Sequence, residues 1–417
     1  MQSGDKRKWL VVGLLFCAAA LNYGDRSAIT AVFPLLHRDL GMSDVALAAV
    51  SSFFLWSYAL VSPVAGYLGD RFSRTTLITS SLFGWSLATA ITSMAASTTQ
   101  LLSMRVVLGV VEAAYMPAAV ALIADCHAKT TRATAMAIHT AGYSAGMVAG
   151  GALAGFLGER YGWRWPLLVL GVAGILLAMG SRRFFRTSAL NAALPAATTA
   201  EPPLGAVRHV LRIPTCRLVL VQAMLAGTAM WILLTWMPLY FLETFRMSLA
   251  QAGFTGTFYA QAGMITGTLA GGQPSDWVAR RKPEYRMLLH AVLYLAAAPL
   301  LLVFLWSRDL GMVAAASVGF FLLRSLGICN EHPVLADLLP ARLRATTIGL
   351  SNSLNCVAGG AGVLLAGLAK PAFGLGAIFA TVSILYVVCS ALLFLGYGKY
   401  FSRDILREES ACFVSSR

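Results

Sequence analysis

The sequence predicts an all-α membrane protein in which twelve transmembrane helices form two pseudo-symmetric bundles of six. Of its 417 residues, 58% are hydrophobic and only 12% are charged, whereas soluble domains average about 25% charged residues. Apolar stretches recur along the whole chain, each long enough to cross a hydrocarbon layer about 30 Å thick as a helix. Two sequence patterns from the first half of the chain recur in the second half, which indicates a duplicated fold.

The apolar stretches place the predicted spans in order along the chain. Helices are predicted rather than barrel strands, because the short alternation of apolar and polar residues typical of membrane strands is missing. A helix also satisfies its own backbone hydrogen bonds in lipid. The predicted spans cover residues 9–36, 45–69, 76–96, 101–125, 135–157, 163–181, 216–242, 251–273, 286–306, 310–338, 345–369 and 373–398.

Positive charge is distributed unevenly between the two sides of the predicted bundle. The side that holds both termini carries 23 of the 32 Lys and Arg residues, and the other side carries six. The positive-inside rule makes the richer side cytoplasmic. The net charge of +14 therefore indicates topology, and we expect no nucleic-acid partner. We expect a multi-pass plasma membrane protein of the bacterial inner membrane, with both termini cytoplasmic.

The longest polar interval between spans, residues 182–215, contains five arginines and a stretch rich in Ala, Pro and Thr. This composition is typical of a cytoplasmic linker. It predicts an N-terminal six-helix bundle over 1–181, a C-terminal six-helix bundle over 216–398 and a cytoplasmic tail over 399–417.

Two repeated patterns support the duplication. The string Gly66-Tyr67-Leu68-Gly69-Asp70-Arg71-Phe72-Ser73-Arg74 reappears 206 residues later as Gly272-Gln273-Pro274-Ser275-Asp276-Trp277-Val278-Ala279-Arg280, with its glycine, acid and terminal base at the same spacing. Asp125 and Arg132 reappear 212 residues later as Asp337 and Arg344. Two matches at nearly one offset indicate one ancestral unit used twice.

This plan, with the loop G-x-x-x-D-R-x-x-R after the second span, resembles the major facilitator superfamily over nearly the whole chain. The resemblance implies the major facilitator fold and a conformational latch at the repeated loops. The alternative is that these loop charges only set topology, and the second copy departs from the pattern because Trp277 stands where an arginine is usual. The candidate gating residues are Asp70, Arg71, Arg74, Asp276, Arg280, Asp125, Arg132, Asp337, Arg344 and Glu331.

Four charged residues in two predicted spans carry the functional expectation. Asp25 and Arg26 lie in the first span, and Arg105 and Glu112 in the fourth, at a similar depth by the helical rise of 1.5 Å per residue. Arg105 and Glu112 share a helix face, because seven residues are about two turns. A charge near the bilayer centre costs about 2.5 to 3.5 kcal/mol on insertion scales, so it normally faces a cavity and has a partner.

Such a cluster has a chemical use. Burial favours the neutral carboxyl group, and a neighbouring arginine favours the carboxylate. A substrate that draws the arginine away therefore lets the acid take up a proton, and the planar fork of arginine suits a carboxylate substrate. The alternative is a neutral salt-bridge cluster that only positions helices.

The same residues resemble a narrower family. Asn22-Tyr23-Gly24-Asp25-Arg26, the span-four sequence from Arg105 to Pro117, and Gly162-Trp163-Arg164 are similar to the anion:cation symporter family. This resemblance implies symport of protons with a sugar acid or other organic anion, with Asp25 and Glu112 as proton sites and Arg26 and Arg105 as substrate contacts. Gly66 to Arg71 and Glu112 to Tyr115 also resemble spinster-type lipid transporters, so a carrier of lysolipids or other amphiphiles is the alternative.

Further polar residues in the spans are candidate substrate contacts. Arg324 lies near the middle of the tenth span and is a plausible second anion contact. Glu331 lies lower on that span, where it could be a gate or the partner of a loop arginine. The other candidates, for each of which packing is the alternative, are Tyr58, Tyr115, His139, Trp236, Tyr240, Gln261, Asn352 and Asn355.

No intramembrane enzyme is predicted, because the metalloprotease pattern HExxH does not occur in the sequence. No primary pump is predicted either, because the nucleotide loop GxxxxGK[ST] does not occur. The cysteines have no paired spacing, so neither a metal nor a cofactor is predicted. We expect a monomer in the lipid bilayer whose partners are a small anion and protons, and whose two halves rock about a central site.

Overall fold

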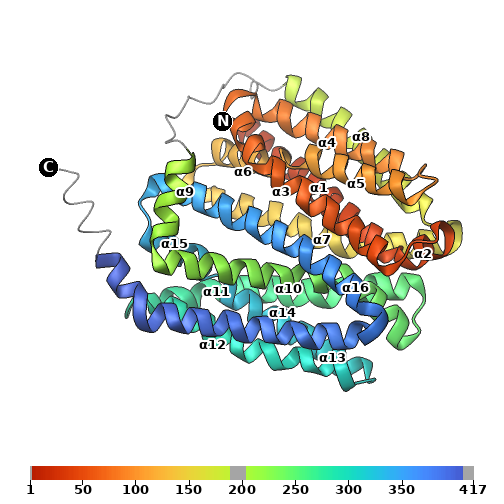
Figure 1. Cartoon of the computed structure of the whole chain (residues 1–417). Coiled ribbons are helices and arrows are strands. Elements are labelled where there is room, and N and C mark those ends of the chain that lie inside the picture. The colour runs from red at the N-terminus through yellow and green to blue at the C-terminus, as the bar shows by residue number, and fades with distance from the viewer. Residues whose placement is uncertain (1, 188–202, 407–417) are drawn as a thin grey trace. The chain divides into compact units, whose positions relative to one another are not determined.

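The structure is a computed structural model that describes residues 2–187 and 203–406. Within these ranges it consists of helices and turns and contains no strand (Figure 1). The helices of the first half are α1 (Gln2–Ala31), α2 (Phe33–Leu40), α3 (Asp44–Arg71), α4 (Arg74–Thr92), α5 (Thr98–Glu112), α6 (Tyr115–Cys126), α7 (Lys129–Tyr161) and α8 (Arg164–Thr187).

The second half begins with the short helix α9 (Pro203–Arg212), which lies within the predicted linker. The remaining elements are α10 (Pro214–Phe245), α11 (Leu249–Ala279), α12 (Tyr285–Ala297), the 3-10 helix η2 (Ala298–Leu302), α13 (Val303–Trp306), α14 (Leu310–Ile328), α15 (Glu331–Leu338), α16 (Ala341–Leu395) and the π-helical turn η3 (Gly396–Tyr400). The predicted tail is helical as far as residue 406.

Two predicted spans are interrupted at matching places. The predicted span 101–125 is divided between α5 and α6, and the predicted span 310–338 is divided between α14 and α15. Pro117 lies four residues after Ala113, and Pro333 lies four residues after Cys329. Because proline has no N–H and its ring clashes with the carbonyl four residues earlier, the helix loses a backbone hydrogen bond at each of these points, although the two residues between the segments keep helical backbone angles in both places.

A glycine separates the last two predicted spans. The ribbon of α16 runs without interruption over both, but Gly374 has φ 72° and ψ 163°. Only glycine adopts this backbone conformation readily. The element is therefore two helices that meet at Gly374.

Seven segments of the described chain are long and apolar enough to cross a membrane, and one of them, Thr346–Leu406, covers both of the last two predicted spans. The described chain also packs into two compact units. The first contains α1 to α8 with Leu234–Phe258 and Val363–Leu368, and the second contains α9, α12 to α15 and the other parts of α10, α11 and α16. Most of the borders between these units fall within α10, α11 and α16 rather than in the predicted linker. They therefore do not test the bundle boundaries at 181 and 216, which stay a prediction.

Glycines on α7 allow it to pack closely against α1. A Cβ atom added at Gly142 would lie 2.6 Å from the carbonyl oxygen of Phe16, and one at Gly146 would overlap the backbone of Ala20. Small residues at such positions let two membrane helices approach at backbone distance. Since α1 carries Asp25 and Arg26, this packing fixes the helix on which the candidate site depends.

We expect Gly146→Ala to destabilise the protein by about 1 to 3 kcal/mol, as is typical when a methyl group is forced into a packed interface. The melting temperature of the purified protein in detergent measures the effect. Gly13→Ala on α1 is the matched control, because a Cβ atom there meets nothing within 4 Å. Equal melting temperatures for the two variants would contradict the close packing.

Candidate functional site

Four charged side chains meet between α1 and α5, three of them buried and that of Arg26 partly buried. Asp25, Arg105 and Glu112 are 2%, 4% and 1% exposed, and the Arg26 side chain is 12% exposed. Each interacts electrostatically with the others of opposite charge. The two acids and two bases balance, which lowers the cost of keeping them inside the bundle.

Arg26 and Glu112 form the central ion pair of this cluster. The Arg26 Nε donates a hydrogen bond to Glu112 Oε1 at 2.9 Å, and Nη2 of the same guanidinium also contacts this oxygen. Nη2 is 3.5 Å from Asn22 Oδ1, one turn away on α1. The pair therefore ties the C-terminal part of α1 to the last residue of α5.

The aromatic ring of Phe54 on α3 is shared by both arginines. The guanidinium carbon lies 4.7 Å from the ring centroid for Arg26 and 5.0 Å for Arg105. Arg26 also lies over the rings of Tyr23 at 4.6 Å and Tyr58 at 5.5 Å. Aromatic faces attract cations in desolvated sites, so these rings hold the arginines without adding a third negative charge.

The remaining two charges of the cluster have fewer partners. Arg105 donates from Nε to the carbonyl oxygen of Val50 at 3.3 Å, and Asp25 Oδ2 accepts a hydrogen bond from the Thr89 hydroxyl at 2.9 Å. Within the described part of the chain, Asp25 Oδ1 and Glu112 Oε2 are buried without a donor at hydrogen-bond geometry, although the Asn22 side chain interacts with the Glu112 carboxyl group. Buried polar atoms are normally hydrogen-bonded, so each acid presents one oxygen that can bind a proton.

An aromatic network extends from Arg26 toward α6 and α7. The rings of Tyr23 and Tyr143 are 4.5 Å apart, and the Tyr143 hydroxyl lies 3.3 Å from His139 Nδ1. His139 Nε2 is 3.0 Å from the Tyr115 hydroxyl, which also donates to the carbonyl oxygen of Leu15. Tyr58, Tyr115 and His139, three of the candidates from the sequence, thus lie at or beside the charged cluster.

Several residues of the site were not found from the sequence. Asn22 and Tyr23 precede Arg26 by about one helical turn. This spacing places them on the same face of the helix as Arg26, so it could have identified them as site residues. No sequence pattern points to Phe54, since a phenylalanine in a span is normally part of the hydrophobic core. No pattern points to Thr89 or Tyr143 either, because their role depends on helix packing.

The other candidate contacts are dispersed. Trp236 and Tyr240 are buried on α10, where the Trp236 ring lies 5.7 Å from Phe33 and the Tyr240 ring 5.6 Å from Phe241.

Three amide candidates lie in the second unit. Gln261 is buried, Asn352 is exposed, and Asn355 accepts a hydrogen bond from Trp231 Nε1 at 3.1 Å. Asn355 therefore has a packing contact.

Arg324 and Glu331 belong to a second buried group on α14 and α15. Arg324 Nε donates to the Tyr386 hydroxyl at 3.1 Å. Glu331 Oε1 accepts from the Ser351 hydroxyl at 3.3 Å and interacts electrostatically with Arg324. Its partners are thus inside the unit rather than a loop arginine.

The candidate gating residues of the first half form contacts at the ends of α4 and α6. Arg74 pairs with Asp125 and donates to the carbonyl oxygen of Ala121 at 3.0 Å. Arg132 donates to the carbonyl oxygens of Ala124 at 2.8 Å and His127 at 3.3 Å, which satisfies the C-terminal end of α6. The side chains of Asp70 and Arg71 lie outside the described residues.

The second half repeats this arrangement with a residue that the sequence analysis missed. Arg286 lies 2.8 Å from Asp337 and 3.2 Å from Asp276, whereas Arg280 is exposed and has no ion pair among the described side chains. Arg286 follows Arg74 by the same 212 residues that separate Asp125 from Asp337. The sequence comparison paired Arg74 with Arg280 because it used the offset of the preceding loop.

Arg344 repeats the contacts of Arg132 at the same offset. It donates to the carbonyl oxygens of Ala336 at 2.7 Å and Leu339 at 3.0 Å. The duplication is therefore visible in individual hydrogen bonds.

One string, Gly142-Tyr143-Ser144-Ala145-Gly146, matches the nucleophile pattern GxSxG of hydrolases. It lies inside α7, whereas that chemistry needs a sharp turn between a strand and a helix. Its glycines serve the packing against α1 described above. The string carries no hydrolase site.

A duplicated helical membrane fold with paired charges inside it defines a membrane transporter rather than an enzyme. A family model described as Major Facilitator Superfamily matches residues 15–363, and the chain belongs to this superfamily.

The chain is 25% identical to a "Probable galactarate/D-glucarate transporter" of Escherichia coli (strain K12), over 98% of this chain and 97% of that protein. It is 29% identical to a protein of the same description from Bacillus subtilis (strain 168), over 63% of this chain and 64% of that protein, so the chain spans less than two thirds of that relative. A solved bacterial homologue of the human lysosomal transporter Spinster superimposes with a TM-score of 0.79 at 22% identity, over 95% of this chain and 97% of that chain.

We expect Glu112→Gln to destabilise the protein by about 3 kcal/mol, because it leaves the Arg26 guanidinium buried without its counter-charge. The double variant Arg26→Gln/Glu112→Gln should recover much of this loss, since both charges are gone. Thermal unfolding of the wild type, both single variants and the double variant gives the coupling energy. Strictly additive losses would contradict the ion pair.

We expect Arg286→Gln to lower transport more than Arg280→Gln, because only Arg286 joins Asp276 and Asp337. The free energy of unfolding should change by about 1 kcal/mol or less in both variants, since these carboxylates are partly exposed. Uptake rates and melting temperatures of the two purified variants test this. A larger transport defect in Arg280→Gln would instead support Arg280 as the equivalent of Arg74.

Proposed function

We propose that this transporter carries a small organic anion, a sugar acid or other carboxylate, together with protons by alternating access. The single observation that carries the proposal is the buried cluster of Asp25, Arg26, Arg105 and Glu112, in which each acid has one oxygen without a donor at hydrogen-bond geometry among the described residues. The protein works in the bacterial inner membrane with both termini cytoplasmic.

Charge balance couples the substrate to protons. The cluster contains two acids and two bases, so it is neutral when all four are ionised. An anion that binds Arg26 competes with Glu112 for the same guanidinium, because that arginine already donates two contacts to one Glu112 oxygen. A proton on the displaced Glu112 restores neutrality, and Asp25 can take a second proton when the substrate carries two negative charges.

The aromatic rings around Arg26 suit the replacement of Glu112 by a substrate anion. Arg26 is held by the faces of Tyr23, Phe54 and Tyr58 as well as by Glu112. Cation–π contacts keep the guanidinium in place while its hydrogen-bond partner changes. The planar guanidinium of Arg26 can then donate two parallel hydrogen bonds to the carboxylate of the substrate.

The relatives support a sugar acid as the substrate class, since two of them are described as galactarate/D-glucarate transporters. Such compounds carry carboxylates for the arginines and hydroxyl groups for the tyrosines. The likeness to the Spinster homologue concerns the fold. Transport of lysolipids is therefore the competing outcome in the experiments below.

The repeated arginine contacts supply the gating part of the proposal. Arg74 with Asp125, and Arg286 with Asp276 and Asp337, join the ends of neighbouring helices within each unit. We expect these ion pairs to break and reform as each half changes its packing.

The substrate class is tested by thermal shift of the purified protein. Hexarates and hexonates should raise the melting temperature, and more strongly at pH 6 than at pH 8, because binding linked to proton uptake tightens as pH falls. Lysophospholipids and uncharged sugars of the same size are the comparison ligands. Stabilisation by lysophospholipids alone would contradict the proposed substrate class.

The coupling is tested in proteoliposomes. Asp25→Asn and Glu112→Gln should each abolish accumulation driven by a pH gradient while retaining exchange of labelled for unlabelled substrate, because exchange needs no net proton movement. Asp39→Asn is the control, since Asp39 pairs with Arg38 outside the cluster. Gradient-driven accumulation by both acid variants at the wild-type rate would leave the cluster with a structural role only.

A further inference from the structure

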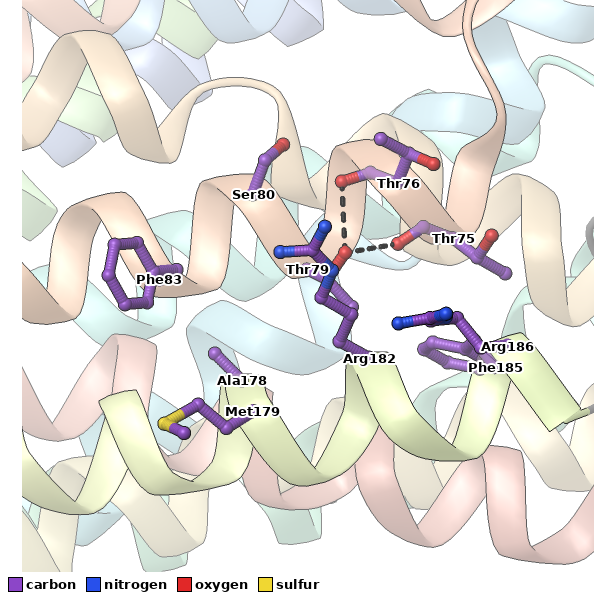
Figure 2. Close-up of a pocket in the computed structure, with 10 residues that line it drawn as sticks. All are labelled: Thr75, Thr76, Thr79, Ser80, Phe83, Ala178, Met179, Arg182, Phe185 and Arg186. Carbon is purple, nitrogen blue, oxygen red and sulfur yellow. Dashed lines mark hydrogen bonds between the residues drawn. The ribbon is translucent and has the colours of Figure 1, made fainter.

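A cavity of about 480 Å³ lies between α4 and α8, away from the charged cluster. Figure 2 shows its lining from both helices, with Arg182 and Arg186 near one end and Phe83 and Met179 near the other. The remaining lining residues are Thr75, Thr76, Thr79, Ser80, Ala178 and Phe185. The cavity thus has a basic, hydroxyl-rich end and an apolar end.

The basic end has unused binding capacity. Arg182 and Arg186 are one helical turn apart on α8, both are exposed, and neither forms an ion pair with any side chain that the structure describes. Opposite them, the Thr79 hydroxyl donates to the carbonyl oxygens of Thr75 and Thr76 (Figure 2). The Ser80 hydroxyl likewise donates to the carbonyl oxygen of Leu77, so the two guanidinium groups are the donors that suit a phosphate.

The apolar end continues along the outer faces of both helices. Exposed large side chains follow at helical spacing on α4 and α8: Phe83, Leu87 and Ile91 on the former, and Val172, Leu176 and Met179 on the latter. Only 33% of the most apolar window of α8 is buried within the protein. In a membrane protein such a face contacts acyl chains.

We propose that this cavity binds the headgroup of an anionic phospholipid of the cytoplasmic leaflet, with an acyl chain along the apolar stripe of α4 and α8. The order of features fits one elongated amphiphile, since the arginines lie at the ends of the helices and the apolar side chains lie toward their middles. Basic pockets between helices on the cytoplasmic side are suited to such headgroups. The chain segment that follows α8, residues 188–202, offers only one carboxylate, Glu201, for two arginines.

The cavity adjoins the ion pair between Arg74 and Asp125. Thr75 and Thr76 follow Arg74, whose guanidinium pairs with Asp125. A bound phosphate would therefore lie at the same end of α4 as a candidate gating residue.

The test is native mass spectrometry of the full chain in detergent, titrated with dioleoylphosphatidylglycerol. Arg182→Gln/Arg186→Gln should weaken binding roughly 10- to 30-fold, as expected for the loss of two arginines near a membrane surface. Arg182→Lys/Arg186→Lys should retain most of it. Lys399→Gln/Arg403→Gln near the C-terminal end of the described chain is the matched control, with the same spacing and the same change of charge, and should bind as the wild type does.

Comparison ligands distinguish a lipid from a free phosphate. Glycerol 3-phosphate and inorganic phosphate should bind far more weakly than phosphatidylglycerol, and Met179→Gln should weaken only the lipid. Equal loss of lipid binding in Arg182→Gln/Arg186→Gln and in the control double variant would show attraction by net charge and would overturn the site. Equal binding of free phosphate and lipid would overturn the lipid assignment, and the single variants Arg182→Gln and Arg186→Gln decide the matter should the double variant not fold.

Discussion

The buried ion pair between Arg26 and Glu112 is the interaction on which the first half of the molecule depends. Removing two charges from water is expensive, and their attraction offsets that cost only when both remain in place with further contacts. Here the further contacts come from Asn22 on α1 and from Phe54 and Tyr58 on α3. One pair therefore fixes how three helices meet, and the glycines of α7 then bring a fourth helix against α1.

The two halves have kept the same helix-end contacts while their interiors have diverged. Arg132 and Arg344 cap equivalent carbonyl groups 212 residues apart. Inside the bundles, the first half holds two acids with two bases, whereas the described part of the second half places Arg324 against Tyr386 and Glu331. The proposed proton coupling thus belongs to the first half, and the shared contacts belong to the fold.

The sequence was sufficient for the fold class and for the meeting of Asp25, Arg26, Arg105 and Glu112, because apolar length, helical rise and the cost of intramembrane charge are properties of the chain itself. It was insufficient for Phe54 and Thr89, whose neighbours are brought to them only by packing. It also matched Arg74 with Arg280 rather than with Arg286, since a repeat read from one loop does not reveal that the offset changes from 206 to 212 within a few residues. The role of the amide candidates Gln261, Asn352 and Asn355 stays a prediction, because polarity in a span does not say which way a side chain faces.

The interruptions at Ala113 and Cys329 have a mechanical consequence. An uninterrupted membrane helix resists bending, since each backbone hydrogen bond lost in lipid is expensive, but Pro117 and Pro333 have each already removed one of these bonds. The segments α5 and α6 can therefore tilt independently at low cost, as can α14 and α15. Glu112 can therefore stay beside α1 while α6, the other part of the same span, tilts, so the residue proposed to bind a proton need not move with the helix end.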